Sequence, residues 1–526
     1  MAKKVRCDMA TPTVANKQIR ARQAFPYRSL QGRTLLFVAL TLALFAVALW
    51  MRLHDLGLPI DRDSYDEGVY WQSLRAMAVG NGLYGQVFYS QPPFFLLSIY
   101  PIYLLFGQTL WAARLGIALV SLLGLLGAWM FGRAAAGRTG AIVALLLLLV
   151  DPLYLRQSQT IQAEAPSAAL SFLAVGAAYL WWNTPSGLAG YCYAAIAGAA
   201  LSLGILGKLL GVTALIPVGL ILLAHGWRVY QRRKTETATW RQEKSLRPAF
   251  AGVVACIVVL AAFVLPFAGS FPQLWRGVVT FHTVAGHIFA STERTNPSII
   301  KPALTGVLAL AALYGTLAAL ARRNWLVLPI LAWLLVTLLI LAVQVPLFPH
   351  HLVALTPALI ALATFGIAPV SWHALYLPHL YNALTAGALV LALLVATVGG
   401  IQERQYYHVE QVQANGATQQ EMRVVRDIQA VTGPHDLIIT DAQFLAALAG
   451  RNTPPQFVDT SGVRIAVGYL TSQELIAIAS QEHVRAVLFY TYRLDTKKLT
   501  AFHSWVAAHF HGVHTYGPGR VLWVRS

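Results

Sequence analysis

The sequence predicts a polytopic α-helical membrane protein with about eleven transmembrane helices and a C-terminal soluble α/β domain. Of its 526 residues, 57% are hydrophobic and only 11% are charged, whereas soluble proteins carry about 25% charged residues. The hydrophobic residues gather in runs of roughly 20, the length at which a helix crosses a bilayer. From Gln402 onward the composition becomes that of a soluble domain, which separates 402–526 from the transmembrane part, 34–401.

The net charge of +18 does not indicate a nucleic-acid-binding protein, because much of it lies in two blocks beside apolar runs. One block is the tail 1–33. The other, 228–248, contains Arg228, Arg232, Arg233, Lys234, Arg241, Lys244 and Arg247. Cytoplasmic loops of membrane proteins are rich in Lys and Arg. We therefore expect both blocks and the N-terminus in the cytoplasm, and no nucleic-acid partner.

The apolar runs predict successive crossings of the membrane. The predicted spans are 34–51, 110–131, 140–155, 165–182, 191–206, 210–227, 249–268, 299–321, 325–343, 352–369 and 381–401. Residues 92–107 are apolar but too short to span, and Pro101 interrupts them, which indicates an interfacial helix within the first outer loop, 54–109. Residues 269–298 are expected to form another outer loop. An odd number of spans after a cytoplasmic N-terminus predicts an extracytoplasmic C-terminal domain. We expect a multi-pass protein of the cell (plasma or inner) membrane.

The C-terminal domain is expected to be a small, mostly parallel α/β unit. Residues 437–441 and 486–492 are short apolar runs rich in β-branched and aromatic residues, which favours buried strands. A last strand is expected at 521–524. Helices are expected between these strands, and this alternation is typical of parallel sheets. The expected helices are 444–449, 472–479 and 496–509.

The first outer loop contains the leading candidate for chemistry, Asp66. Asp66 and Glu67 begin a pattern in which Val69, Tyr70, Leu74 and Met77 share one face of a helix. Charge at a membrane surface is costly unless it has a purpose. A purely structural interpretation also exists, because Ser64 and Glu67 match a capping box. We also expect a lipid-sized apolar groove near Asp66, between 92–107 and the spans that follow.

The order of five features along the chain resembles the C-type (GT-C) membrane glycosyltransferases. These features are the Tyr65-Asp66-Glu67 triplet after a span, Pro92-Pro93, Arg114 in a helix, Glu164 in a second outer loop, and Lys208 after a later helix. Within GT-C the sequence is most similar to the protein O-mannosyltransferase and aminoarabinose transferase (family 39, PMT-like) group, over the layout of residues 30–400.

The resemblance implies a glycosyltransferase that moves a sugar, with inversion, from a polyprenyl-phosphate donor to an acceptor hydroxyl on the extracytoplasmic side. The other implied partners are the lipid bilayer and an acceptor that is a lipid, a glycan or a protein. Asp66 would be the general base, with Glu67 beside it. The donor phosphate would be held by Arg114, Lys208 and Arg156.

The resemblance allows a divalent cation, Mg²⁺, Mn²⁺ or Zn²⁺, without requiring one. Candidates for the acceptor or for a metal are Glu164, His282, His287, His350 and His351. One departure from the group bears on the metal. The aminoarabinose transferases carry Glu-Lys before their Pro, and this chain has Ser90-Gln91, which lack that acid and that base.

Two other classes of protein remain alternatives. A transporter or flippase for polyprenyl-linked lipids would predict two repeated halves with broken spans in matching places, and no such repeat is visible. A non-catalytic membrane scaffold would use its C-terminal domain to bind a partner. Turnover of a labelled donor separates both from an enzyme.

Overall fold

The computed structural model describes residues 27–63, 65–233, 246–367, 378–416 and 418–525. Most of the predicted basic tail, the cap residue Ser64 and the centre of the block 228–248 lie outside these residues. The chain divides into two compact units at Val47. The described part of the first unit is the beginning of helix α2 (Tyr27–Leu53). All other elements belong to the second unit, Ala48–Ser526.

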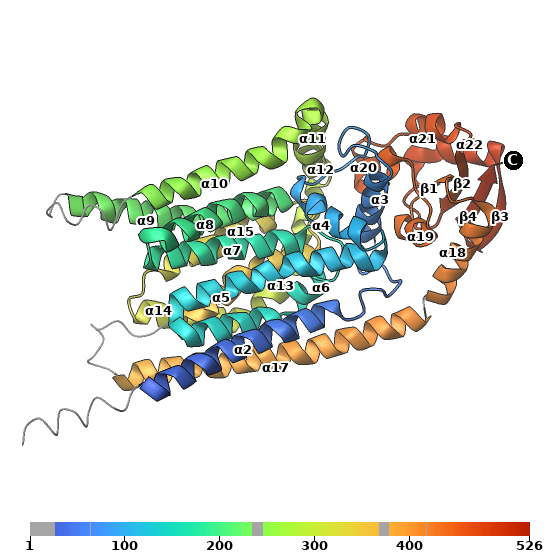
Figure 1. Cartoon of the computed structure of the whole chain (residues 1–526). Coiled ribbons are helices and arrows are strands. Elements are labelled where there is room, and N and C mark those ends of the chain that lie inside the picture. Colours follow the sequence, from blue (N-terminus) through green and yellow to red (C-terminus); the bar gives the residue numbers. More distant parts are fainter. Residues whose placement is uncertain (1–26, 64, 234–245, 368–377, 417, 526) are drawn as a thin grey trace, which may run out of the picture. The chain divides into compact units, whose positions relative to one another are not determined.

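The chain from α2 to α17 is almost entirely helical (Figure 1). Its first half contains α3 (Asp66–Ala78), α4 (Phe94–Leu105), α5 (Leu110–Leu149), α6 (Pro152–Gln157), α7 (Glu164–Asn183), α8 (Gly187–Gly207), η1 (Leu209–Ala214) and α9 (Leu215–Arg233). Its second half contains α10 (Arg247–Val264), η3 (Leu265–Ser270), α11 (Phe271–Trp275), η4 (Arg276–Thr280), α12 (Phe281–Ile288), η5 (Ala290–Thr295), α13 (Asn296–Thr305), α14 (Val307–Ala321), α15 (Val327–Val343), η6 (Pro349–Leu355), α16 (Thr356–Phe365) and α17 (Pro378–Gly416).

Within the described residues, seven helices are long and apolar enough to cross a membrane, or eight if the bent pair α13 and α14 is one span. Each range predicted as a span contains helix, but α15 and the η6–α16 segment are shorter than the usual span. The multi-pass character is therefore clear from the structure, and the number of eleven stays a prediction. The expected outer loop 269–298 is largely helical, with α11, η4, α12 and η5, and its position outside the membrane stays a prediction.

Helix α5 consists of two helical segments that fold back on each other. Ala136 and Gly137 have non-helical dihedral angles, and Gly137 has a φ of 70°. A Cβ added to Gly132 would lie 2.2 Å from the carbonyl oxygen of Gly140. Residues eight apart in a straight helix are separated by about 12 Å along the axis. The chain therefore reverses at Gly137, as the separate predicted spans 110–131 and 140–155 require.

The C-terminal part is a mixed sheet with helices, and the expected mostly parallel sheet is wrong. Strand order is β1-β2-β4-β3, and only the β1–β2 pairing is parallel. The unpredicted strand β3 has mostly exposed residues and no apolar alternation. The elements are α18 (Thr418–Val431), β1 (Leu437–Thr440), α19 (Gln443–Leu448), η8 (Pro455–Phe457), α20 (Gly462–Ala466), α21 (Ser472–Ala479), β2 (Val484–Phe489), η9 (Lys497–Leu499), α22 (Thr500–His509), β3 (Phe510–Gly517) and β4 (Arg520–Arg525).

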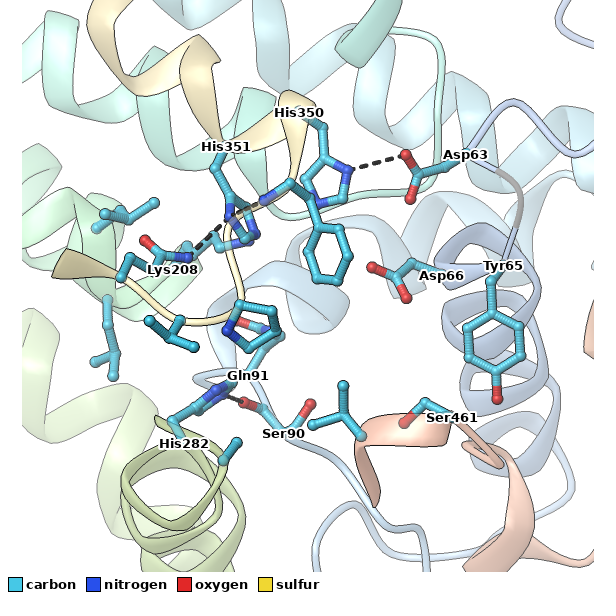
Figure 2. A pocket seen from close by; sticks show the side chains of 18 of the residues that line it. Asp63, Tyr65, Asp66, Ser90, Gln91, Lys208, His282, His350, His351 and Ser461 are labelled. Atoms are coloured by element: carbon cyan, nitrogen blue, oxygen red, sulfur yellow. Dashed lines mark hydrogen bonds and ion pairs between the residues drawn. The ribbon is translucent and has the colours of Figure 1, made fainter. Parts of the chain in front are cut away.

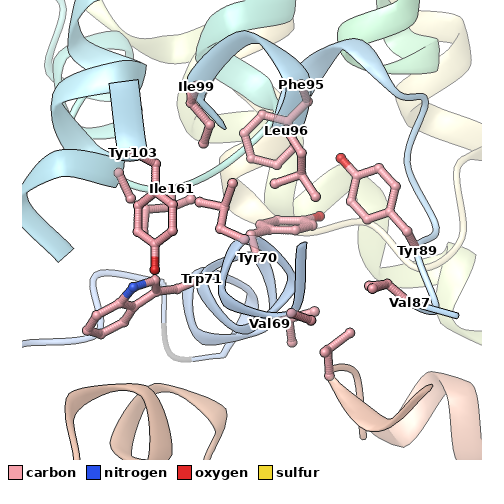
Figure 3. Packing of buried hydrophobic residues seen from close by; sticks show 14 of the residues in the cluster. Val69, Tyr70, Trp71, Val87, Tyr89, Phe95, Leu96, Ile99, Tyr103 and Ile161 are labelled. Atoms are coloured by element: carbon pink, nitrogen blue, oxygen red, sulfur yellow. The ribbon is translucent and has the colours of Figure 1, made fainter. Parts of the chain in front are cut away.

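Helix α3 is buried between the membrane helices and the C-terminal part. Figure 3 shows its Tyr70 packed among Tyr89, Phe95 and Leu96, the last two from α4. On another face, Gly68 touches α19 so closely that a Cβ there would lie 2.4 Å from the backbone nitrogen of Phe444. Packing on both sides fixes the position and direction of α3, and with them the position of its first residue, Asp66.

Candidate active site

Asp66 is the first residue of α3, and this end of the helix borders a large cavity. Tyr65 precedes the helix and is buried, whereas Asp66 is half-buried and lines the cavity. Figure 2 shows its carboxylate directed into the open space. The N-cap residue of α3 is Tyr65, which makes no side-chain capping bond, and the capping box expected from Ser64 lies outside the described residues. Within the described residues, no hydrogen bond occupies the Asp66 carboxylate, so it is free to accept a proton.

The cavity beside Asp66 has a volume of about 1290 Å³. One part of its wall is apolar and comes from η1 and α15, with Leu209, Val212, Ile340 and Val343. The remaining wall is polar and includes residues of the C-terminal part. Of the described residues that line the cavity, none belongs to α4. The groove was expected beside 92–107, the segment that contains α4, and this position is wrong. The buried side chains of α4 pack in the hydrophobic core around Tyr70 instead.

Two further ionisable groups lie within reach of Asp66. Oxygen atoms of Asp63 and Asp66 and a ring nitrogen of His350 all lie within 4.8 Å of one another. His350 Nδ1 is 3.0 Å from Asp63 Oδ1. Burial, and then the neighbouring Asp63 carboxylate, raise the pKa of Asp66 to about 7. A carboxylate with that pKa is suited to take a proton near neutral pH.

A second cluster brings together four predicted residues from three elements. Glu164 at the start of α7 forms an ion pair with Lys208, which follows α8. His350 Nε2 and His351 Nε2 lie 3.6 and 3.7 Å from Glu164 Oε1. Lys208, His350 and His351 all line the cavity. The structure thus brings Glu164, Lys208 and the histidine pair together, and their proposed roles stay predictions.

Glu67 and Arg114 are brought together too, but away from the cavity. Glu67 accepts two bonds from Arg114, of 2.8 and 2.7 Å, and one from each of the backbone N–H groups of Arg62 and Ile161. Both side chains are fully buried. Arg114 and its hydrogen bonds lower the pKa of Glu67 against the opposing effect of burial. The remaining Arg114 donors bind the carbonyl groups of Leu56, Leu58 and Ile60.

The other predicted residues differ in their relation to the cavity. Arg156 lines it, donates to the carbonyl oxygen of Arg62 at 2.9 Å and lies over the ring of Tyr406. His282 of α12 also lines it, with Nε2 2.8 Å from the carbonyl oxygen of Ser90. His287, on the same helix, is exposed and is not among the residues that line the cavity.

Sequence reasoning missed several residues of the site. Asp63 lies three residues before Asp66, but only its contact with His350 indicates a role for it. Asp459, Ser461 and Arg493 reach the cavity from the C-terminal part. Tyr65 Oη is 3.3 Å from Asp459 Oδ1, a contact between residues 394 positions apart. No local pattern could have indicated these residues.

The residues around Asp66 fit a divalent cation. Asp63, Asp66 and His350 offer two carboxylates and one imidazole, and Glu164, His350 and His351 form a second group of three. The first group is the better one, since Glu164 in the second is already neutralised by Lys208. Mixed carboxylate and imidazole ligands suit Mn²⁺ or Zn²⁺ better than Mg²⁺.

Fold and site together define a multi-pass membrane protein whose cavity has one apolar wall and a polar wall with both acidic and basic side chains. Residues 90–239 match the family model described as dolichyl-phosphate-mannose-protein mannosyltransferase. No curated protein matches the chain. The resemblance to GT-C glycosyltransferases is confirmed by this match and by the shared fold of the solved structures below.

Similar solved structures cover nearly the whole chain. ArnT from Cupriavidus metallidurans bound to undecaprenyl phosphate shares 16% identity, with a TM-score of 0.59 over 94% of this chain and 98% of that chain. Its apo state gives a TM-score of 0.58 with the same identity and coverage. The apo oligosaccharyltransferase of Archaeoglobus fulgidus shares 15% identity, with a TM-score of 0.51 over 92% of this chain and 74% of that chain. At these identities the likeness shows a common fold.

Proposed function

We propose that this protein transfers a sugar from a polyprenyl phosphate to an acceptor hydroxyl, with Asp66 as the general base. The observation that carries the proposal is the Asp66 carboxylate, which is free of hydrogen bonds among the described residues and borders a cavity of about 1290 Å³ with one apolar wall. An undecaprenyl-phosphate complex exists for a protein of the same fold, and the apolar wall would suit such a lipid.

The proposed reaction needs one proton acceptor and cations for the leaving group. The acceptor oxygen attacks C1 of the sugar, its proton passes to Asp66, and the bond between C1 and the phosphate oxygen breaks with inversion. The electron pair leaves with the polyprenyl phosphate. Arg156 and Lys208 line the cavity and would stabilise the charge that develops on that phosphate. Glu67 and Arg114 would hold the first outer loop in shape.

The proposed orientation keeps the N-terminus in the cytoplasm and the site outside it, in a cell (plasma or inner) membrane. Eleven spans with 402–526 on the extracytoplasmic side belong to this proposal. The positive-inside bias of the block 228–248 supports it. In this arrangement, the donor reaches the site from the membrane, and the acceptor comes from the aqueous side.

We expect the purified full chain to cleave the sugar–phosphate bond of at least one donor in a panel of labelled undecaprenyl-phosphate sugars. The measurement is the release of undecaprenyl phosphate, in proteoliposomes that contain cell-envelope extract as the source of acceptor. Movement of intact donor across the bilayer without cleavage would support a transporter instead. If the protein neither cleaves nor moves any donor, the scaffold alternative remains and the proposal is refuted.

The proposed cofactor is one Mn²⁺ or Zn²⁺ ion held by Asp63, Asp66 and His350. The cation would favour the ionised form of Asp66 because it offsets the repulsion from Asp63. We expect Mn²⁺ or Zn²⁺ to raise the melting temperature of the metal-stripped protein, since a ligand that binds the folded state stabilises it.

The metal site is tested by calorimetric titration, independently of activity. Asp63→Asn and His350→Ala should each weaken binding by about 10-fold or more. His287→Ala is the matched control, because His287 lies on an exposed helix face and does not line the cavity. Equal metal binding by all four proteins would place any bound ion elsewhere and contradict this site.

A further inference from the structure

Among the cationic side chains that line the cavity, Arg493 has an environment different from the others. Three long cationic side chains among the described residues line the cavity: Lys208, Arg156 and Arg493. Lys208 is paired with Glu164, and Arg156 donates to a backbone carbonyl group. Arg493 lies over the ring of Tyr65, with Cζ 4.0 Å from the ring centroid. Among the described residues no carboxylate lies within ion-pair distance of Arg493, so its charge is not neutralised by a direct partner.

The loop that carries Arg493 is held rigidly by a buried carboxylate. Asp441, at the end of β1, is fully buried and accepts backbone bonds from Tyr490, Thr491 and Leu494 at 2.8, 3.0 and 3.3 Å. Tyr492, next to Arg493, has a φ of 64°, a conformation that is uncommon for residues other than glycine. A carboxylate with three backbone bonds thus shapes the loop around this arginine.

The ring beneath Arg493 is fixed as firmly as the loop. Tyr65 Oη accepts a bond from the backbone N–H of Thr460 at 2.7 Å and lies 3.3 Å from Asp459 Oδ1. Tyr65 directly precedes Asp66 in the chain. The guanidinium group of Arg493 therefore lies over the residue that precedes the proposed base, and it belongs to the part of the cavity wall that the C-terminal part contributes.

The proposed metal ion would offset Asp63 and Asp66, but the Asp459 carboxylate, 3.3 Å from Tyr65 Oη, would still repel an anionic acceptor unless a cation received it. Asp63, Asp66 and Asp459 all line the cavity. A guanidinium group binds phosphate or carboxylate with two parallel hydrogen bonds. We propose that Arg493 recognises a negatively charged group on the acceptor, so that the acceptor is an anionic hydroxyl compound, carrying phosphate or carboxylate. This inference rests on the proposed transferase function.

Binding of three matched probes tests the proposal without requiring turnover. Glucose, glucose 6-phosphate and glucuronate share the sugar hydroxyl groups and differ in charge, and the last two separate phosphate from carboxylate. In low-salt calorimetry with the full chain, at least one anionic probe should bind and glucose should bind at least about tenfold more weakly. Arg493→Gln should weaken anion binding by about 10- to 100-fold, the loss expected for a charge-assisted bond.

Two controls decide whether Arg493 acts on the acceptor. Arg493→Lys keeps the charge but not the fork and should give intermediate binding, whereas Arg485→Gln, on the exposed face of β2, should bind like the wild type. Undecaprenyl phosphate should bind equally to wild type and Arg493→Gln. The proposal is overturned if no anionic probe binds better than glucose, or if Arg493→Gln leaves anion binding unchanged. Loss of undecaprenyl-phosphate binding would overturn it too, since Arg493 would then hold the donor.

Discussion

Asp66→Asn is expected to reduce sugar transfer by about 10²- to 10⁴-fold, the range for loss of a general base. The substitution keeps the size of the side chain and removes the negative charge and the ability to accept a proton. At the first position of a helix the lost charge costs only about 0.3–1 kcal/mol, so α3 should keep its packing against α4 and α19. Initial rates of undecaprenyl-phosphate release measure the effect.

The pH profile of the wild type provides an independent check on Asp66. In the metal-stripped protein, burial and the Asp63 carboxylate raise the pKa of Asp66 to about 7, so its turnover should rise roughly tenfold between pH 6 and 8 as the base ionises. A bound cation would move this rise to lower pH, because it favours the ionised carboxylate. The raised pKa of Asp66 also makes the stability of the fold depend on pH. The folded state retains this proton between about pH 4 and 7 while the unfolded chain has lost it, so ionising Asp66 lowers the stability of the fold. Asp66→Asn should therefore be at least as stable as wild type at pH 8.

Asp55→Asn is the matched control for Asp66→Asn. Asp55 lies in the same outer loop, is not among the residues that line the cavity, and contacts His54 and Gln411. It should retain activity and its pH profile. If Asp66→Asn keeps more than about a tenth of wild-type turnover, Asp66 is not the base and the proposed mechanism fails.

Glu67→Gln is expected to destabilise the fold by about 3–5 kcal/mol, because it leaves the buried Arg114 without its counter-ion. Glu67 accepts four hydrogen bonds and is fully buried. The lowered pKa of Glu67 means that its stabilising effect is present above the usual Glu pKa and is lost as pH falls through the folded-state value. Thermal unfolding in detergent at pH 7 measures the loss.

A double variant separates a structural role from a catalytic one. Glu67→Leu combined with Arg114→Met removes both charges, so it should destabilise the fold by less than the sum of the two single changes. The backbone groups that both side chains bind still lose their partners. Molecules that fold in the double variant should still transfer sugar, because neither residue lines the cavity. A stable Glu67→Gln protein with no turnover would instead assign Glu67 to the chemistry, as the sequence alone suggested.

The sequence predicted those parts of the fold that depend on local patterns. Long apolar runs gave the helices, and the reversal at Gly137 lies between two runs that were predicted as separate spans. The apolar face after Asp66 indicated α3 and its start. Glu164 and Lys208 were both chosen from the sequence, but for different roles, and nothing in the sequence indicated their ion pair.

What the sequence could not predict depends on contacts between distant residues. Glu67 looked like a companion of Asp66, and only its contact with Arg114 shows that it points away from the cavity. Arg493 and Asp459 lie in loops without any motif, and their place beside Tyr65 follows from how the C-terminal part packs. The short helices of 271–295 and the exposed strand β3 lack the periodicity from which such elements are predicted.

The close contact between Gly68 and Phe444 also has a consequence for biosynthesis. Gln72 of α3 donates to the carbonyl oxygen of Gln443, a residue 371 positions later in the chain. Ribosomes add about 5–20 residues per second, so α3 leaves the ribosome tens of seconds before α19 exists. During that interval, the face of α3 around Gly68 has no partner, and Asp66 cannot take its final place. The membrane helices can be inserted and still lack a finished site until α19 has been translated.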